Sequence, residues 1–474
     1  MTNEEKPPLS RRDILKTGGK AAAASALAGV SIPHVHAAPD NTVKMALIGC
    51  GGRGTGAVKN ALTVSKAMPE KVGPVKLNAM ADVFENKLVQ SRDTLLRQKD
   101  IEELLDIPEE RQFLGFDAYK NAIDSVGKGG VAIFTTPLAF RVPFFRYAID
   151  KGVHVFMEKP VVADGPSGRK MLSLAKKADE KGLKVGVGLM CRHCDARNEL
   201  KRRLDDGEIG KIHTMRAYRM QGPIGSCFSG PNDTDESELA YQIRRFHSFL
   251  WLSGGSFSDF YIHNIDECCM MKDAWPVEAK ASGGRHYRGE DAIDQNFDSY
   301  AVEYTFRDGT KLFFTGRNMI GCHQEFASYA HGTKGAAVIS TSSHTPARCR
   351  TYKGHKIEMN WRKPAANQIW AYPQEPRERS PYEIEWENLL GAIRNNEPYN
   401  EVPRGVQASL VTAMGRMAAH TGQVVTYQDM LKCEHEFAPG VEKIRSFDDA
   451  SPMQADENGR YPIPEPGVKK DREY

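Results

Sequence analysis

Five glycines fall within eight residues of the sequence, at positions 49, 51, 52, 54 and 56. Each glycine inside a helix costs about 1 kcal/mol relative to alanine, so the stretch predicts neither a helix interior nor a strand interior. Three of them have the spacing Gly49-x-Gly51-x-x-Gly54, directly after an apolar run and before a run with helical spacing. The first glycine then allows a tight turn, the second lets a pyrophosphate approach the backbone, and the third lets helix and strand pack closely. The pattern predicts a dinucleotide-binding turn.

A second apolar run, residues 75–83, carries the acid Asp82 at its end. A carboxylate at that place accepts hydrogen bonds from ribose hydroxyls and repels a 2′-phosphate, so NAD is favoured over NADP. The alternative is a glycine turn and a solvated aspartate without a ligand. The two motifs together, in a strand–helix–strand context, favour the cofactor.

Asp259 and His263 are four residues apart in the segment 254–270 and share one face of a predicted helix. A carboxylate beside an imidazole fixes its tautomer and raises its basicity. His263 is therefore expected to accept the proton of a hydroxyl group while the carbon gives up hydride. Lys159, at the C-terminal end of a predicted strand, would hydrogen-bond the same oxygen and stabilise developing charge. Asp266 continues the same face one turn on, and a structural role and a substrate contact stay equally open for it.

The first half of the sequence predicts the fold that positions these residues. From Val43 to about Val187, strand-like and helix-like runs alternate. Alternation of this kind predicts a parallel, doubly wound α/β sheet of the Rossmann type.

After about residue 210 the pattern changes to alternation with period two, which predicts a largely antiparallel sheet. Asp308-Gly309 is a hairpin-turn signal between two such runs. The segment 341–380 is rich in proline and charge, with little periodicity. Helices that pack onto the body are predicted at 381–395 and 406–422. The class is therefore α/β: an N-terminal Rossmann sheet and a C-terminal α+β part with an open, mostly antiparallel sheet.

Four motifs occur in one order along the sequence: the glycine turn, Thr-Thr-Pro at 135–137, Glu-Lys-Pro at 158–160, and Asp-x3-His from Asp259. This order, together with the segment 415–431, carries a family resemblance. The motifs resemble the Gfo/Idh/MocA family of oxidoreductases over nearly all of residues 40–432. The resemblance implies a Rossmann domain followed by an open sheet whose face covers the nicotinamide. It also implies that Lys159, Asp259 and His263 form the catalytic set.

The resemblance further implies which residues contact the cofactor and the substrate. The cofactor contacts expected are Gly49, Gly51, Gly52, Arg53, Gly54, Asp82, Thr136, Pro137 and Glu158. Arg192 and His193 are candidates for the substrate rim, and a helix-flanking role is equally open for both. The residues after Pro137, Leu-Ala-Phe-Arg, depart from those of relatives and leave the substrate undefined. No metal is expected, because hydride chemistry in the family needs none and the Cys191/Cys194 pair lacks a second pair of ligands.

Three functions follow from the resemblance. The first is an NAD-dependent oxidoreductase that acts on a sugar or cyclitol hydroxyl. The alternative is an NAD-dependent glycosidase or lyase, which forms a transient 3-keto sugar and recycles its NAD internally. The third is a non-catalytic sugar-binding protein, and the joint presence of Lys159, Asp259 and His263 argues against it.

The first 38 residues resemble a twin-arginine (Tat) export signal. Arg11-Arg12 precede the apolar stretch 21–32, and an Ala-x-Ala-like cleavage point follows at 35–38. This predicts a bacterial protein that the Tat machinery exports to the periplasm already folded. Nine scattered cysteines are no disulfide framework, and most are expected to be free, buried thiols.

The length of 474 residues suggests two or three domains. We expect a signal peptide at 1–38, a Rossmann domain at 39–163, a substrate and oligomerisation domain at 164–454, and an extended tail at 455–474. A formal net charge of +3 is too close to balance to indicate a nucleic-acid partner. A homo-oligomer that acts on a small carbohydrate is expected.

Overall fold

The structure, a computed structural model, describes residues 41–474 except for 287–288, 290, 360–362 and 375–376. The expected Tat signal at 1–38 lies outside the described residues, so it stays a prediction.

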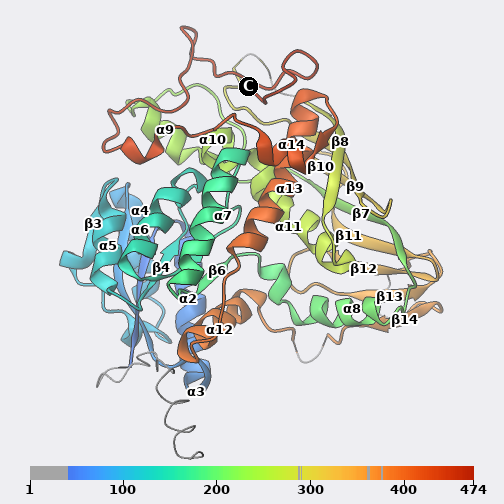
Figure 1. Cartoon of the computed structure of the whole chain (residues 1–474), viewed down its shortest axis with the longest axis horizontal. Coiled ribbons are helices and arrows are strands. Elements are labelled where there is room, and N and C mark those ends of the chain that lie inside the picture. The colour runs from blue at the N-terminus through green and yellow to red at the C-terminus, as the bar shows by residue number, and fades with distance from the viewer. Residues whose placement is uncertain (1–40, 287–288, 290, 360–362, 375–376) are drawn as a thin grey trace, which may run out of the picture. The chain divides into compact units, whose positions relative to one another are not determined.

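Six parallel strands form the first sheet (Figure 1). Their order in the sheet is β3-β2-β1-β4-β5-β6. Their bounds are β1 (Val43–Ile48), β2 (Val75–Asp82), β3 (Gln112–Leu114), β4 (Val131–Phe134), β5 (His154–Met157) and β6 (Val185–Val187). The predicted parallel, doubly wound sheet is confirmed. The strand order reverses between β1 and β4, and ligands of such sheets bind at the C-terminal ends of the strands at this point.

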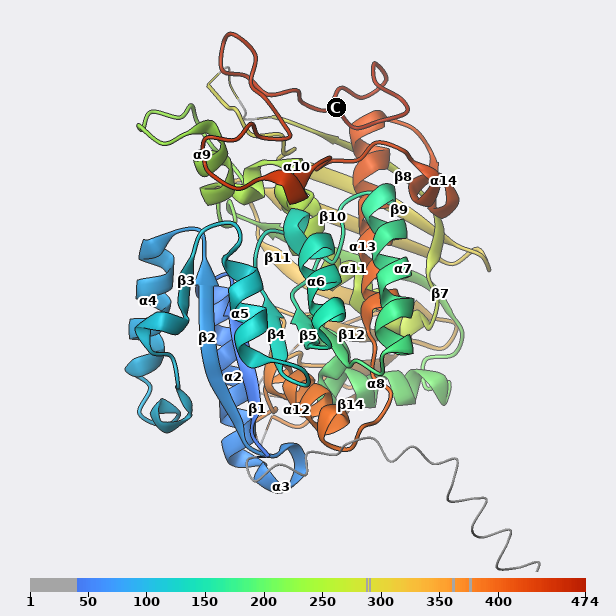
Figure 2. The same cartoon turned by 60° about the vertical axis from the view of Figure 1, so that its left-hand side comes forward.

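Helices cover both faces of this sheet, because its strands are apolar on both sides. Met45 and Leu47 of β1 pack in one hydrophobic cluster, whereas Ala46 and Ile48 pack in another. The first sheet's helices are α2 (Gly52–Ala67), α3 (Pro69–Val72), α4 (Glu85–Leu96), α5 (Ala118–Val126), α6 (Arg141–Lys151) and α7 (Gly165–Glu180). Figure 2 shows α5, α6 and α7 in front of the strands and α2 behind them.

One helix from late in the chain also belongs to this layer. The helix α12 (Pro381–Arg394) packs against α2 and α3, although it follows the second sheet in sequence. Its buried Trp386 stacks on Phe156 of β5, with ring centroids 4.4 Å apart.

The second sheet has nine strands in the order β14-β13-β12-β11-β7-β10-β9-β8-β15. All neighbours pair antiparallel except β7 and β10, which are parallel. The bounds are β7 (Ile212–Gln221), β8 (Pro276–Gly284), β9 (Ser299–Phe306), β10 (Lys311–Asn318), β11 (Glu325–Gly332), β12 (Gly335–Thr341), β13 (Arg350–Lys353), β14 (Gln368–Ala371) and β15 (Val425–Thr426). The mostly antiparallel sheet is confirmed. The segment 341–380 has little periodicity, yet it forms two short strands: β13, which pairs with β12, and β14, which pairs with β13.

Two long helices lie against one face of this sheet. The helix α11 (Gly255–Lys272) contacts β7 and β11, while α13 (Val402–Thr421) contacts β8, β9, α11 and also α7 of the first layer. The other α-helices of the described residues are α8 (Asp195–Asp205), α9 (Glu238–Arg244), α10 (Leu250–Ser253) and α14 (Tyr427–Lys432). Residues 42–474 cluster as one compact unit. The domain boundaries at 163 and 454 therefore stay predictions.

The segment 455–474 runs without helix but is anchored at its end. Glu473 is 2% exposed, and its carboxylate accepts hydrogen bonds from Arg416 on α13. Among the described residues, no helix is both long enough and apolar enough to cross a bilayer.

Candidate active site

The glycine turn between β1 and α2 lines a cavity of about 610 Å³. Gly49 has φ +97°, and a Cβ atom there would lie 2.8 Å from the main-chain carbon of Thr135. A Cβ on Gly54 would lie 2.2 Å from the oxygen of Gly49. By contrast, nothing lies within 4 Å of a Cβ built on Gly51 or Gly52. Two glycines therefore allow close packing of the turn, and two leave open space beside it.

The start of α2 has the properties of an anion site. Gly51 is its N-cap, no side chain caps it, and its first turn holds no acidic residue. The first N–H groups of a helix have no partner within the helix, and the helix dipole favours negative charge there. The open space at Gly51 and Gly52 therefore fits the pyrophosphate of a dinucleotide.

Asp82 lies at the end of β2, beside the turn. Its carboxylate accepts the N–H of Cys50 at 2.6 Å and the N–H of Phe84 at 2.9 Å. Burial raises its pKa, although these two main-chain bonds act in the opposite direction. A carboxylate has about four lone-pair sites, so capacity remains for ribose hydroxyls. Asp82 thus both fixes the turn and faces the cavity.

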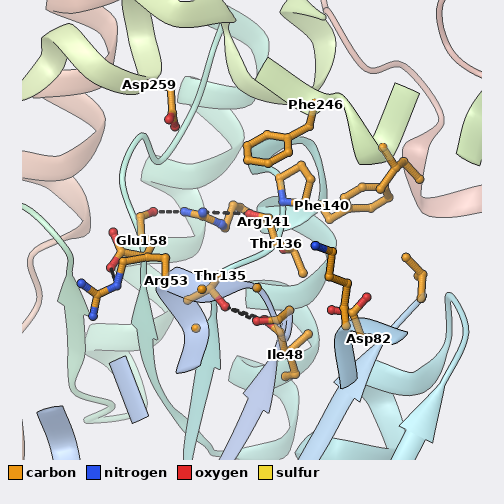
Figure 3. A pocket seen from close by; sticks show the side chains of 18 of the residues that line it. Ile48, Arg53, Asp82, Thr135, Thr136, Phe140, Arg141, Glu158, Phe246 and Asp259 are labelled. Carbon is orange, nitrogen blue, oxygen red and sulfur yellow. Dashed lines mark hydrogen bonds and ion pairs between the residues drawn. The ribbon is translucent and has the colours of Figure 1, made fainter. Parts of the chain in front are cut away.

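Arg141, the first residue of α6, holds two parts of the cavity wall together (Figure 3). Its guanidinium donates to the main-chain oxygens of Thr136, at 3.0 Å, and of Glu158 and Pro160. Burial lowers its pKa to about 10, although the charge of Glu158 acts to raise it. The Thr-Thr-Pro and Glu-Lys-Pro motifs are thereby placed side by side.

Arg53 supplies a further charge near the turn. Its Nε lies 3.2 Å from Oε1 of the buried Glu158, and its guanidinium lies over the ring of Tyr382 at 4.7 Å. Both Arg53 and Glu158 line the cavity. The first turn of α2 is thereby tied to the end of β5.

Lys159 and Asp259 form an ion pair across the cavity. The ammonium of Lys159 donates to the main-chain oxygen of Asp259 at 2.7 Å and lies 3.6 Å from its carboxylate. The other carboxylate oxygen lies 3.4 Å from Nε2 of His247. Burial acts to raise the pKa of Asp259, but the charge of Lys159 and the contact with His247 lower it well below its usual range.

His247 has a defined tautomer. Its Nδ1 accepts the main-chain N–H of Ser226 at 3.3 Å, so in the neutral ring the proton is on Nε2 and faces Asp259. The ring also stacks on Phe260, with centroids 5.0 Å apart. His247 is therefore built to hold the Asp259 carboxylate in position.

His263 lies one turn beyond Asp259 on α11 and also lines the cavity. Its ring centroid is 4.4 Å from that of His344, and its Nδ1 has no hydrogen-bond partner among the described residues. Burial lowers its pKa well below the usual range, and Lys159 and Arg219 lower it further. The imidazole is thus neutral at neutral pH and able to accept a proton.

The expected pairing of Asp259 with His263 is corrected by this geometry. The two share a helix face, as predicted, but the hydrogen-bond and ion-pair contacts of Asp259 within the described residues are with Lys159 and His247. Asp259 does act to raise the pKa of His263, but burial outweighs it. The basicity of His263 is therefore lowered rather than raised.

Three predicted substrate residues lie outside this cavity wall. Arg192 donates to both carboxylate oxygens of Asp266, which is buried. His193 accepts from Asn388 at 2.9 Å and lies 3.3 Å from Glu401. The structure brings the other predicted site residues together but leaves these three in separate contacts.

Several cavity residues were missed by the sequence analysis, among them Arg141, Arg219, His247 and His344. Arg141 belongs to the Leu-Ala-Phe-Arg stretch that stood out as a departure from the family pattern, which was a usable signal. The others come from separate elements, and no spacing in the sequence links them to the glycine turn.

The described part of the chain does not favour metal binding or thiol reactivity. No group of three or more His, Cys, Asp or Glu side chains there is arranged to hold a metal ion. All nine cysteines are free thiols, and all except Cys322 and Cys433 are buried. Burial raises the pKa of Cys191 and Cys194, so the pair is held as thiols.

Comparison with curated proteins finds cyclitol dehydrogenases. Scyllo-inositol 2-dehydrogenase (NAD(+)) of Bacillus subtilis is 27% identical over 323 residues, which is 68% of this chain and 80% of that protein. Inositol 2-dehydrogenase of Corynebacterium glutamicum is 23% identical over 142 residues, which is 30% of this chain. The aligned part spans 40% of the length of the Corynebacterium protein. No family model matches the chain.

Solved structures of sugar oxidoreductases share the fold. Aldose–aldose oxidoreductase of Caulobacter crescentus superposes with a TM-score of 0.60 at 18% identity, and levoglucosan dehydrogenase with NADH superposes with 0.62 at 14%. Each match covers 81% of this chain and 99% of the other. The chain therefore shares the overall fold of these solved oxidoreductases, in line with the fold that the motifs implied.

Proposed function

We propose that this protein transfers hydride between a hydroxyl-bearing carbon of a sugar or cyclitol and the nicotinamide of NAD. The observation that carries the proposal is that Lys159, Asp259 and His263 line the same cavity as the glycine turn. Side chains that can transfer a proton therefore line the same cavity as the expected binding site of a redox cofactor. The similarity to cyclitol dehydrogenases supports the substrate class.

NAD is the cofactor that best fits the turn. Asp82 would accept ribose hydroxyls and repel a 2′-phosphate. The name of the Bacillus relative states NAD(+), and a structure of the same fold holds NADH. When bound, NAD supplies the acceptor for the two electrons and the hydrogen that leave the carbon as hydride.

The chain's own groups would handle the proton. His263 is neutral and accepts the hydroxyl proton while the carbon–oxygen bond becomes a carbonyl. Lys159 uses one of its three donors on Asp259, so two remain for the substrate oxygen and stabilise charge that develops there. Asp259 and His247 keep the ammonium in place.

The test is direct. The protein is purified, denatured and assayed by mass spectrometry for nucleotide, and the native protein is incubated without oxygen with free sugars, cyclitols and glycosides. We expect NAD in the denatured sample and formation of reduced nicotinamide with at least one polyol.

Recovery of NADP alone would contradict the role of Asp82, and a protein that binds no dinucleotide would refute the proposal. Glycoside cleavage without net reduced cofactor would instead support a glycosidase or lyase that recycles its NAD.

We also propose export to the periplasm through the Tat pathway. The support is Arg11-Arg12 before the apolar stretch 21–32. Free dinucleotide is expected to be scarce outside the cytoplasm. The cofactor would therefore be carried inside the folded protein and regenerated in place.

A further inference from the structure

We propose that the substrate carries a carboxylate and that this carboxylate binds Arg219. The preferred substrate is then a sugar acid of the hexuronate class rather than a neutral sugar. This inference rests on the proposed hydride transfer and specifies its substrate.

Arg219 lies on β7 of the second sheet and lines the cavity. Its Nη1 lies 3.2 Å from Nε2 of His344, and its guanidinium lies 3.8 Å from the centre of the Phe326 ring. Its Nε is buried and has no hydrogen-bond partner among the described residues. A guanidinium has five N–H donors, and these contacts use few of them.

The other cavity arginines have acceptors, which makes Arg219 unusual. Arg53 pairs with Glu158, Arg244 pairs with Glu236, and Arg141 donates to three main-chain oxygens. Arg219 has neither a carboxylate within ion-pair distance nor a main-chain oxygen as a hydrogen-bond acceptor in the described part of the chain. A partly buried charge without such a partner is costly, so its retention at a cavity wall points to an anionic ligand.

The local charge favours a singly charged group. Burial lowers the pKa of Arg219 to about 10, so the side chain stays charged at neutral pH. Lys159 is paired with Asp259, and burial keeps His263 and His344 neutral. Within the set of Lys159, Asp259, Arg219, His263 and His344, one positive charge is left, which a carboxylate balances, whereas a phosphate monoester would bring close to two negative charges. The planar guanidinium also matches a carboxylate with two parallel hydrogen bonds.

The position of Arg219 assigns the anion to the reacting end of the cavity. His344 contacts both Arg219 and His263, so the guanidinium and the proposed base share the His344 ring as a neighbour. Asp82 and the start of α2, which fit the ribose and pyrophosphate, belong to the first sheet. The carboxylate would thus be held a short distance from the carbon that is oxidised.

The experiment compares a hexuronate with the hexose that differs from it only at C6, on the NAD-loaded protein. Wild type should have the higher kcat/KM on the hexuronate. Arg219→Gln should lower kcat/KM for the hexuronate about 10- to 100-fold, the range for a charge-assisted hydrogen bond, and change the hexose value little. Arg219→Lys should recover part of the loss. Arg216→Gln is the matched control, since Arg216 is on the same strand but outside the cavity wall.

Two results with wild type would overturn the inference: equal or better use of the hexose, or preference for the hexose 6-phosphate. Two results with Arg219→Gln would do the same: an equal loss of kcat/KM for both sugars, or loss of bound NAD. Calorimetry of the hexuronate with NAD-loaded wild type and Arg219→Gln gives a readout that needs no turnover. If no sugar reduces the cofactor but the hexuronate still binds through Arg219, the proposed function fails and the carboxylate site stands. If the hexuronate binds wild type and Arg219→Gln equally well, the site is refuted whatever the activity.

Discussion

At the scale of single residues, the proton chemistry depends on two groups held in different ways. Lys159 is fixed by Asp259, whose carboxylate is itself held by His247. His263 has no such partner at Nδ1, and burial keeps its imidazole neutral. A neutral imidazole with a free acceptor is suited to take a proton, while a fixed ammonium is suited to stabilise charge on oxygen.

We expect His263→Ala and Lys159→Ala each to lower kcat by about 100- to 10,000-fold, the usual contribution of general acid–base groups. Bound NAD should stay near the wild-type level, because neither change touches the glycine turn. Steady-state kinetics and nucleotide release after denaturation measure the two effects. His323→Ala, at an exposed histidine, is the control. Near-full activity of both variants on every wild-type substrate would show that the assigned catalytic set is wrong.

Spacing along the chain predicted part of this site and could not predict the rest. The four-residue step from Asp259 to His263 fixes a shared helix face, and both residues do line the cavity. One of the two partners of Asp259 is His247, which precedes α11 and reaches the carboxylate only through the fold of residues 246–258. Arg219 comes from a strand of the second sheet, and no local pattern connects it to α11.

At the scale of elements, one buried arginine joins the segments that carry the site. Arg416 on α13 donates to Gly254 and Ser258 at the start of α11, and to the main-chain oxygen of Ala163 after β5. Its charge is balanced by Glu473, and Arg416 itself is fully buried. The helix that carries Asp259 and the loop that follows Lys159 are thus tied to the same side chain.

We expect Glu473→Ala to lower the free energy of unfolding by about 3–5 kcal/mol, because it leaves the Arg416 charge buried and unpaired. Denaturant titration measures the loss. Glu465→Ala is the matched control from the same segment, since its pair with Lys469 is partly exposed and such pairs are worth about 0–1 kcal/mol. Equal stability of the two variants would contradict the proposed anchor.

Elements with a strong local pattern were predictable, and those that depend on distant partners were not. The apolar run 75–83 contains β2, and Asp308-Gly309 lies in the turn between β9 and β10, as their local patterns predict. By contrast, β13 exists because β12 offers an edge to pair with, and β14 exists because β13 does. Residues 455–474 look like a free tail in sequence, because the residue that holds Glu473 lies 57 positions earlier on α13.

At the scale of the whole molecule, the cavity exists only when both sheets are in place. The glycine turn, Arg141 and Lys159 come from the first sheet and its loops, whereas Arg219 and α11 come from the second part of the chain. A cofactor can enter such a site only after the chain has folded. Export through the proposed Tat pathway would carry a protein that has already folded and bound its cofactor.

We expect the double change Arg11→Lys with Arg12→Lys to retain the folded, NAD-loaded protein in the cytoplasm. The physical reason is that the Tat machinery reads the arginine pair, whereas Lys keeps the charge but lacks the planar guanidinium. Cell fractionation with antibody detection measures the distribution between cytoplasm and periplasm. The control is Arg216→Gln, which alters an arginine far from the signal and should leave export unchanged. If the double variant reaches the periplasm as efficiently as wild type, the pathway is not Tat, and the argument that the cofactor travels inside the folded protein loses its support.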